Sequence, residues 1–436
     1  MNLLIKKGRV IDPDTKLDEI CDLYIEEGKI VKVGNHLKVK PNREIDASGC
    51  YVMPGLIDLH VHLRDPGLTY KEDVESGAAA AAKGGFTTIV AMPNTKPPID
   101  SPDRVRYVHV KAKHVTPIQV LQSGCVTKGM KGEEPSDIAG MAKAGIPAIT
   151  EDGKSVMDAN VYKEAMQLAK ENHLPVFAHC EDRNLVQGGC MNADEVSRAW
   201  GLPGISNSVE DVIVARDILL AQEVGVPLHL CHCSTKNCYT MVKAAKEAGV
   251  QVTAEVCPHH FTLTSEDMVQ GDTNYKMNPP LRTKEDLEYL RRGLKEDVFE
   301  IISTDHAPHS REEKAQDMEH APFGIVGLET SVALTITELV KTGIITPMQM
   351  AEKMSYNPAK IVGIDKGDIQ PGKIADIVIF DPEKTYKIDK TKFASKGRNT
   401  PFDGREVTGK VMATIVDGRV VYDCLLYTSD AADDLI

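Results

Sequence analysis

Positive charge is scarce in this sequence of 436 residues. Lys and Arg total 51 against 64 Asp and Glu, and the formal net charge is −13. Nucleic acids and anionic membranes are bound through basic surfaces, so this balance argues against both as broad partners. A small anionic substrate remains compatible, because one Arg or a metal ion can reverse the sign of the potential inside a pocket.

Long apolar runs are also missing. No run approaches the roughly 20 residues that a membrane-spanning helix requires, and the N-terminus has no apolar signal-peptide core. Ten cysteines in a chain of this length do not form a disulfide scaffold, and we expect reduced thiols. With 42% apolar and 26% charged residues, the sequence predicts a soluble, cytoplasmic, globular protein.

The two ends of the chain share one sequence pattern. Residues 1–50 and 370–423 read as short strands separated by turns that Gly and Asp mark. We expect both ends to pair into one small β-domain, a β-sandwich, with residues 51–369 inserted between them as a second domain. Residues 424–436 do not continue the strand pattern, and we interpret them as a non-native tail.

The middle of the chain alternates apolar strand candidates with helical patterns. Eight candidate strands end near His62, Asn94, Val126, Asp152, His179, His232, His259 and Asp305. Helical patterns lie between them, and three stop at a C-capping glycine: Gly84, Gly225 and Gly249. Eight such units predict an α/β fold, a closed (β/α)₈ TIM-like barrel. The alternative, an open doubly wound sheet, lacks its Gly-x-Gly-x-x-Gly fingerprint here.

Metal-ligating residue types accumulate at the ends of the predicted strands. Alternate residues of a strand face the same side, so His60 and His62 point together from the first strand tip. Chemistry in such a barrel lies at the C-terminal strand ends. Histidine suits zinc, and a carboxylate can bridge two ions. The sequence therefore predicts a binuclear metal site with the ligands His60, His62, Asp152, His179, His232 and Asp305.

Neighbouring cysteines and histidines offer other interpretations. A cysteine-ligated site is the main rival, but these cysteines flank a His on the other strand face, so packing is their favoured role: Cys180, Cys231, Cys233 and Cys257. His229 lies three residues before His232 and is expected to be structural. We expect His259 and His260 to be structural or to support the ligands.

Two metal ions at a barrel mouth supply a hydroxide nucleophile and polarise a carbonyl group. Asp305 is the candidate for the proton shuttle, so the predicted chemistry is hydrolysis of an amide-like bond or its reverse.

The planar guanidinium of Arg can donate two parallel hydrogen bonds to a substrate carboxylate. The candidates for substrate binding are Arg64, Asn94, Asn278 and His309, and the charged loop 310–323 is expected to close over the mouth.

These residues stand in stretches that resemble dihydroorotases of the bacterial, longer-chain type, within the amidohydrolase superfamily. The stretches are 54–64, 91–95, 278–282, 303–309, 322–330 and 372–377. Together they extend the resemblance over residues 1–423. The His-x-His and Ser-Thr-Asp-His pieces are superfamily-wide, whereas those around Arg64, Asn94 and Asn278 are more particular to dihydroorotases.

The resemblance implies reversible cyclisation of N-carbamoyl-L-aspartate to (S)-dihydroorotate, the third step of de novo pyrimidine synthesis. It implies two zinc ions per subunit, bridged by hydroxide and Asp152, with Asp305 as the acid and base. The implied substrate contacts are His62, Arg64, Asn94, Asn278, His309 and the backbone of Phe323 and Gly324. Two departures from the commonest motifs are Asp65 and Glu151, and Glu151 as the bridge stays an alternative.

Another cyclic-amide hydrolase, an allantoinase or hydantoinase, is the second hypothesis. Hydantoinases bridge their metals with a carboxylated Lys on the fourth strand, but here Lys154 lies two residues beyond Asp152. A non-catalytic amidohydrolase-like subunit is the third hypothesis, disfavoured because all six ligands are present. The expected partner is the small-molecule substrate, and a homodimer and association with aspartate carbamoyltransferase are candidate assemblies.

Overall fold

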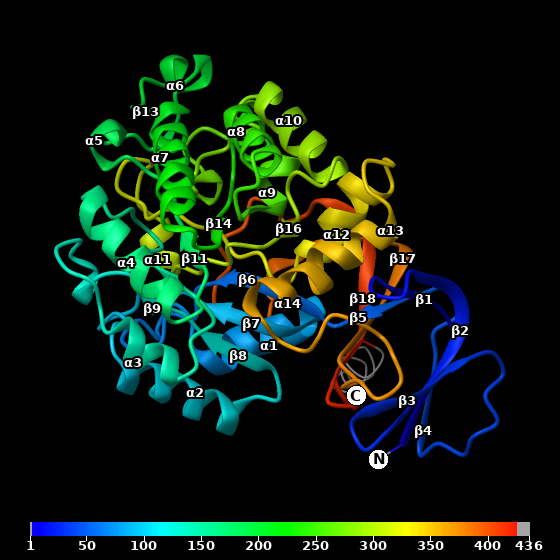
Figure 1. Ribbon diagram of the computed structural model, residues 1–436. Coiled ribbons are helices and arrows are strands. Elements are labelled where there is room, and N and C mark those ends of the chain that lie inside the picture. Colours follow the sequence, from blue (N-terminus) through cyan, green and yellow to red (C-terminus); the bar gives the residue numbers. More distant parts are fainter. Residues whose placement is uncertain (1, 425–436) are drawn as a thin grey trace.

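A barrel of parallel strands and an adjoining sheet make up the chain. The computed structural model describes residues 2–424, and all of the expected tail except Cys424 lies outside the described residues. Figure 1 shows the helices arranged around the barrel, with the strands of the N-terminal end beside it. None of the described helices is both long and apolar enough to cross a membrane.

The barrel has the eight strands that the sequence predicts. They are β6 (Leu56–Val61), β7 (Phe86–Ala91), β8 (Gln119–Gln122) with β9 (Gly124–Cys125), β10 (Ile149–Thr150), β11 (Val176–Ala178), β14 (Leu228–Leu230), β15 (Val252–Val256) and β16 (Ile301–Ile302). The third strand is interrupted at Ser123, so β8 pairs with β7 while β9 pairs with β10. A parallel bridge between Val61 and His306 closes the ring. The (β/α)₈ prediction is therefore confirmed.

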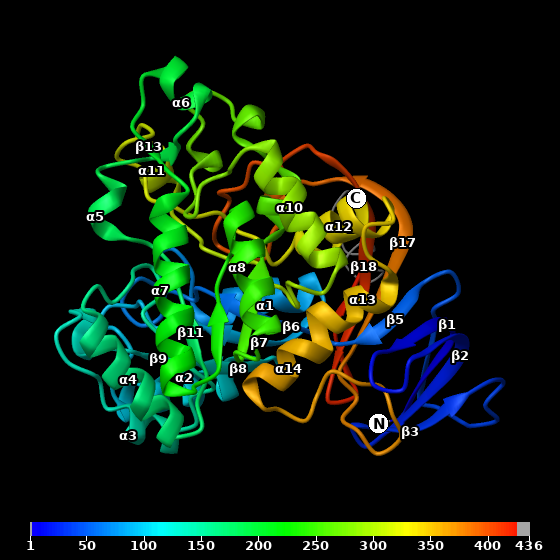
Figure 2. The same ribbon diagram turned by 45° about the horizontal axis from the view of Figure 1, so that its top comes forward.

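A helix follows each barrel strand. These helices are α1 (Val74–Gly84), α2 (Pro102–Val115), α3 (Ile138–Lys143), α4 (Ala159–Glu171), α7 (Ser208–Val224), α8 (Lys236–Glu247), α10 (Lys284–Lys295) and α12 (Ser331–Thr335). Figure 2 shows α7, α8 and α10 on the outside of the strands. The left-handed cap of α1 is Gly85, with φ 91°, rather than the predicted Gly84. Gly84 instead packs against the backbone of Leu328.

Shorter elements occupy the two ends of the barrel. At the C-terminal ends of the strands, the connections contain α5 (Arg183–Val186), β12 (Met191–Asn192), α6 (Glu195–Trp200), β13 (Gly204–Ile205), α9 (Pro258–Thr262) and α11 (Arg311–Lys314). At the opposite end lie α13 (Pro347–Ala351) and α14 (Asn357–Val362). Ser355 donates to Pro54 O at 2.9 Å and Asn357 to Glu300 O at 3.0 Å, which fixes this segment beneath the strands.

Both chain ends build one eight-stranded sheet, which confirms the prediction that they pair into one β-domain. Its order is β19-β18-β17-β5-β1-β2-β3, and β4 pairs with β1. The strands are β1 (Asn2–Asp12), β2 (Leu17–Glu26), β3 (Lys29–Gly34), β4 (Arg43–Asp46), β5 (Tyr51–Pro54), β17 (Ile377–Lys387), β18 (Glu406–Val416) and β19 (Arg419–Asp423). Only Gly55 separates β5 of this sheet from β6 of the barrel. The domain bounds 1–50 with 370–423 and 51–369 stay our proposal.

Apolar side chains fill the inside of the barrel and the sheet separately. The barrel interior includes Ile57, Leu59, Val90, Phe177 and Ile301. A second core, made by the strands of the two chain ends, includes Leu3, Val10, Leu23, Ile377 and Ile415. The interior of the barrel is thus packed, and the polar residues beyond the strand ends are left to form a site.

A buried Arg joins two connections of the barrel, the one between β15 and α10 that contains it and the one between β11 and α7. The Arg282 guanidinium donates to Glu210 Oε2 at 3.2 Å, Asn192 Oδ1 at 3.1 Å and Ile205 O at 3.0 Å. The side chains of Arg282 and Glu210 are each 3% exposed. Removing one partner of such a pair leaves an uncompensated buried charge.

We predict that Arg282→Met lowers the free energy of unfolding by about 3–5 kcal/mol, because Glu210 loses its counter-charge. Urea denaturation of the metal-loaded protein measures this loss. Arg292→Met is the matched control: its pair with Glu296 is surface-exposed, at 53% and 34%, and its removal should cost less than about 1 kcal/mol. Equal losses in the two variants would contradict the structural role of Arg282.

Candidate active site

Four imidazoles surround one carboxylate at the mouth of the barrel. Asp152 Oδ1 lies 3.1 Å from His60 Nε2, 3.5 Å from His179 Nδ1 and 3.7 Å from His232 Nε2. Its other oxygen, Oδ2, lies 3.2 Å from His62 Nε2. The five side chains come from four separate strands of the barrel, and Asp152 stands between them.

The donors form two groups, and Asp305 contacts one of them. Its Oδ1 lies 3.4 Å from His60 Nε2 and 3.2 Å from His62 Nε2. On the other side of Asp152, His179 Nδ1 and His232 Nε2 are 2.9 Å apart. The structure thus brings all six predicted ligands together, as two neighbouring sets of donors that share one carboxylate.

Hydrogen bonds fix which nitrogen of two imidazoles faces the centre. His60 Nδ1 lies 2.8 Å from Glu255 Oε1, and a carboxylate only accepts, so His60 Nδ1 carries the proton. His62 Nδ1 likewise donates to Asn94 Oδ1 at 2.9 Å. The Nε2 lone pair of each ring then points inward, the arrangement in which imidazole binds metal.

The centre contains polar atoms that the described residues leave unsatisfied. His60 Nε2 and Asp152 Oδ1 are buried and have no hydrogen-bond partner in the described part of the chain. An unsatisfied buried polar atom costs about 1–3 kcal/mol. Cations held between these donors would remove that cost, so the residues present fit a metal centre of nitrogen and oxygen ligands.

Both carboxylates of the centre are ionised at neutral pH. Burial opposes ionisation of Asp305, but the imidazoles of His60 and His62 outweigh it and lower the pKa of Asp305 to about 2. Burial also opposes ionisation of Asp152, yet the adjacent imidazoles of His60, His179 and His232 hold its pKa well below the usual range. The centre therefore carries two negative charges, which bound cations would neutralise.

Three of the predicted site residues have left-handed backbone conformations. Arg64, His232 and Asp305 have φ angles of 60°, 32° and 48°. For residues other than glycine, such conformations cost of order 1–3 kcal/mol each and cluster at functional sites. They turn the chain sharply just beyond the strands, and this directs the side chains into the mouth.

Glu151 faces away from the imidazoles. Its Oε2 accepts the backbone N–H of Thr127 at 3.0 Å, and its Oε1 accepts the Thr127 hydroxyl. Asp152 is the neighbour that contacts the four histidines. The geometry therefore favours Asp152 over Glu151 as the shared carboxylate.

A cationic pocket lies beside the ligands. Arg64 Nε donates to Pro308 O at 3.2 Å, and its Nη2 lies 3.2 Å from His309 Nε2. His309 Nε2 donates to Phe323 O at 2.8 Å, while its Nδ1 accepts from Lys71 Nζ at 3.3 Å. Burial, then the charges of Arg64 and Lys71, depress the pKa of His309, so its ring is neutral. A carboxylate entering this pocket would meet positive charge.

Two predicted substrate contacts are bound to protein groups in this structure. Asn278 Nδ2 donates to Glu181, which lies beside His179. The backbone N–H of Gly324 donates to Lys276 O at 3.0 Å. Gly324 has φ 134°, and a Cβ there would lie 2.7 Å from the Ala307 side chain, so glycine is required.

Comparison with known proteins decides the family. A model of the family "Dihydro-orotase-like" matches residues 49–238. A dihydroorotase of Clostridioides difficile (strain 630) is 49% identical over 422 residues, 97% of this chain and 100% of that protein. A dihydroorotase of Pelotomaculum thermopropionicum is 48% identical, with 97% and 98% covered. The chain belongs to the dihydroorotase family.

Solved structures agree on the fold. An L-hydantoinase from Arthrobacter aurescens superposes with a TM-score of 0.85 at 26% identity, covering 97% of this chain and 96% of that one. A D-hydantoinase gives the same TM-score at 27% identity. Because the dihydroorotases are far more similar in sequence over the same length, the chain is a cyclic amide hydrolase of the dihydroorotase rather than the hydantoinase type.

Sequence reasoning missed Glu255, although a signal for it exists. Its carboxylate accepts from the His60 ring at 2.8 Å, the His229 ring at 2.9 Å and the backbone N–H of His232 at 3.0 Å. A Glu one residue before the end of an apolar strand is unusual, because burying a charge requires partners. In this member of the dihydroorotase family, the buried Glu identifies a residue that supports the histidines of the active site.

Asn399 was also missed, and no local pattern reveals it. Its Nδ2 donates to Ala307 O and Gly324 O, each at 3.0 Å, and its Oδ1 accepts the backbone N–H of His309 at 3.1 Å. Asn399 lies between β17 and β18, far along the chain from the loops that it joins. Its amide fixes the backbone that carries His309 and Gly324.

The loop 310–323 is anchored at its centre. Lys314 is buried and its ammonium donates to the backbone carbonyls of Lys276, Pro322 and Gly324 at 3.2, 3.0 and 3.0 Å. The sequence suggested few apolar anchors in this loop, and the structure adds a polar one. Closure of the loop over substrate stays a prediction.

We predict that Glu255→Gln weakens binding of the more tightly held metal ion by about 10–100-fold, because His60 loses the carboxylate that orients its ring. Competition with a chromophoric chelator measures the dissociation constants. Glu151→Gln is the matched control, since Glu151 is buried next to Asp152 but bonds to Thr127, and its affinity should not change. Wild-type affinity in Glu255→Gln would contradict the orienting role.

We predict that Asn399→Asp raises KM for dihydroorotate about tenfold with metal content unchanged, since a carboxylate would face two carbonyl oxygens and leave them unsatisfied, at about 1–3 kcal/mol. Steady-state kinetics and metal analysis test this. Asn357→Asp is the control, because Asn357 also donates to a carbonyl, that of Glu300, but at the other end of the barrel. Equal KM changes in both variants would exclude a local effect.

Proposed function

We propose that the chain catalyses the reversible cyclisation of N-carbamoyl-L-aspartate to (S)-dihydroorotate, the third step of de novo pyrimidine synthesis. One observation carries the proposal: two sets of metal donors that share Asp152 lie next to a cationic pocket made by Arg64, Lys71 and neutral His309. Dihydroorotate combines a cyclic amide with a carboxylate, and so matches both parts. Hydrolysis of dihydroorotate, assayed alongside a metal count, tests the proposal.

Two zinc ions are the proposed cofactors. His60, His62 and Asp305 would hold one ion, His179 and His232 the other, and Asp152 both. When bound, such ions would lower the pKa of water toward neutrality and polarise a carbonyl oxygen. The histidine-rich donor set supports zinc over harder cations such as magnesium.

Asp305 is the proposed acid and base. In the hydrolytic direction its carboxylate takes a proton from the attacking oxygen and delivers it to the ring nitrogen as the C–N bond breaks. In the synthetic direction it takes a proton from the ureido nitrogen and returns it to the departing oxygen. Its contacts with His60 and His62 hold it ionised and in place for both transfers.

The carboxylate of the substrate is assigned to Arg64, Asn94 and His309. Arg64 and His309 are adjacent, and Asn94 joins the same region to the metal donors through His62. The roles proposed for Asn278 and for the backbone of Phe323 and Gly324 require a change of partner when substrate binds. His62 would contact both the metal and the substrate.

Location and assembly belong to the same proposal. We place the enzyme in the cytoplasm, where its substrate is made. A homodimer and association with aspartate carbamoyltransferase are the candidate assemblies. Light scattering of the purified protein, alone and with aspartate carbamoyltransferase, distinguishes them.

We predict that Asp305→Asn lowers kcat at least 10²–10⁴-fold, about the range that general acid–base catalysis contributes, while the fold survives. Circular dichroism and metal analysis accompany the assay, because Asp305 also contacts the ligand histidines. Asp317→Asn is the control: it is 68% exposed in the following loop and should leave kcat unchanged. Turnover near that of the wild type at neutral pH would remove Asp305 from this role.

We predict that Arg64→Met weakens binding of dihydroorotate by about 2–3 kcal/mol, or roughly 30–150-fold, because a charge-assisted pair is lost. Arg64→Lys keeps the charge but not the forked geometry and should recover part of the loss. Dihydrouracil, the same ring without the carboxylate, serves as the substrate control. The clamp role fails if Arg64→Met alters both substrates equally or leaves dihydroorotate affinity unchanged.

A further inference from the structure

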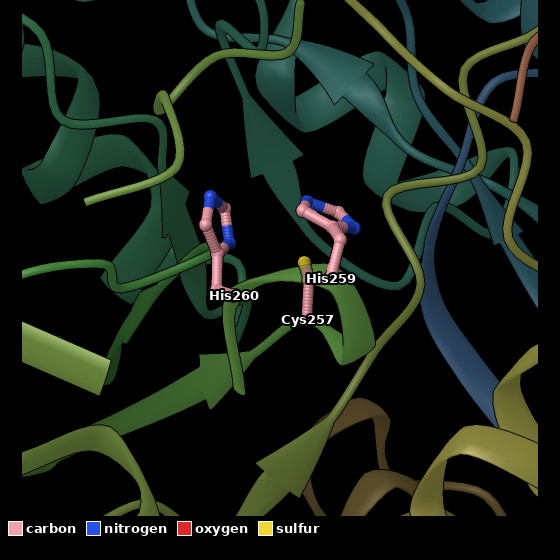
Figure 3. Close-up of side chains that lie close together, drawn as sticks. All are labelled: Cys257, His259 and His260. Atoms are coloured by element: carbon pink, nitrogen blue, oxygen red, sulfur yellow. The ribbon is translucent and has the colours of Figure 1, made fainter. Parts of the chain in front are cut away.

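Three metal-binding side chains gather at the end of β15, outside the six residues assigned above. They are Cys257, His259 and His260, at the start of α9, and Figure 3 shows them pointing into one space. One donor atom from each residue lies within 4.8 Å of the others. All three residues are buried, with His259 2% and His260 3% exposed.

The two imidazoles hold nitrogens that the described protein leaves unsatisfied. His260 Nε2 lies 2.8 Å from Pro279 O, and because a carbonyl only accepts, His260 Nε2 carries the proton. Its lone pair is then on Nδ1, which is buried without a partner. His259 Nε2 is likewise buried and unpartnered in the described part of the chain. Side-chain packing by itself does not explain why two unsatisfied nitrogens are buried in one cluster.

We propose that Cys257, His259 and His260 form a separate site for one thiophilic divalent cation, such as Zn²⁺ or Cd²⁺. Thiolate and imidazole are the ligands that such ions prefer. Bonds of about 2.3 Å to sulfur and 2.0–2.1 Å to nitrogen require the donors to move together by roughly 1 Å, which side-chain rotation provides. Binding replaces the thiol proton, which is released to solvent.

The environment favours the metal-binding form of both rings, whereas burial raises the pKa of the Cys257 thiol, so the incoming ion has to displace the thiol proton. Burial, and then the adjacent ring, lowers the pKa of His259 well below the usual value, and burial lowers that of His260 to about 3. Both rings are thus neutral, the form that binds metal. Three protein ligands leave a fourth position open, as in zinc sites that exchange ligands rather than structural ones.

A second cluster of possible metal donors also contains a thiol. His60, Cys231 and Glu255 also lie close enough to share an ion. There, however, the His60 ring and Glu255 bond to each other, and Glu255 also accepts from His229 and His232. His60 Nδ1 and both Glu255 oxygens are therefore satisfied, whereas His259 Nε2 and His260 Nδ1 are not.

Cadmium binding tests the site without reference to turnover, so the result is independent of the proposed reaction. The purified protein with its resident metals is titrated with Cd²⁺, and thiolate-to-cadmium charge-transfer absorption is recorded with the metal count. The binuclear donors contain no sulfur, so the band reports a thiolate site. We expect one equivalent to produce the band, and Cys257→Ser to lose it while keeping the other metals.

Matched variants locate the thiolate. Cys231→Ser and Cys180→Ser should keep the band, and His260→Gln should weaken cadmium binding at this site at least tenfold. Absence of the band in the wild type, its survival in Cys257→Ser, or its loss in Cys231→Ser would overturn the proposal. If Cys257→Ser does not fold, ¹¹³Cd NMR of the wild type and of His260→Gln decides, because a thiolate ligand shifts the resonance strongly and the loss of a ring must move it.

Discussion

One buried carboxylate links the ends of three barrel strands through hydrogen bonds. Glu255 on β15 accepts hydrogen bonds from the His60 ring of β6 and, beyond β14, from His232, as well as from the His229 ring. Because Glu255 is fully buried, each of these donors is needed to keep its charge satisfied. The orientation of metal donors on two strands thus depends on a side chain of a third strand that is not itself assigned as a ligand.

The fold and the convergence of the six proposed metal donors could be predicted because their signals are local. Alternation of apolar strands and helices gives the barrel, and the spacing of His60 and His62 gives their common face. His60 lies within its strand and the other five donors stand one to three residues beyond theirs, so strand ends that can be read from the sequence also locate His179 and Asp305. The structure then separates Asp152 from Glu151, because the partner of Glu151, Thr127, lies just beyond another strand, β9.

Long-range contacts account for what could not be predicted. The partners of Asn399 and Lys314 are backbone carbonyls, which leave no trace in the sequence. The left-handed turns at His232 and Asp305 contradict local preference and are held by their surroundings. Likewise, the sequence showed two glycines after α1 but not that Gly85 caps the helix while Gly84 meets the backbone of Leu328.

The connection between β17 and β18 sets the order in which the pocket can be completed. It carries Asn399 to the loops of His309 and Gly324, and Ser395 to Glu72. Domains begin to form as the chain emerges from the ribosome, N-terminal parts first. The barrel strands emerge well before residue 399, so a nascent barrel still lacks the amide that fixes the loops of His309 and Gly324. These two loops therefore reach their final arrangement only after residue 399 has been made.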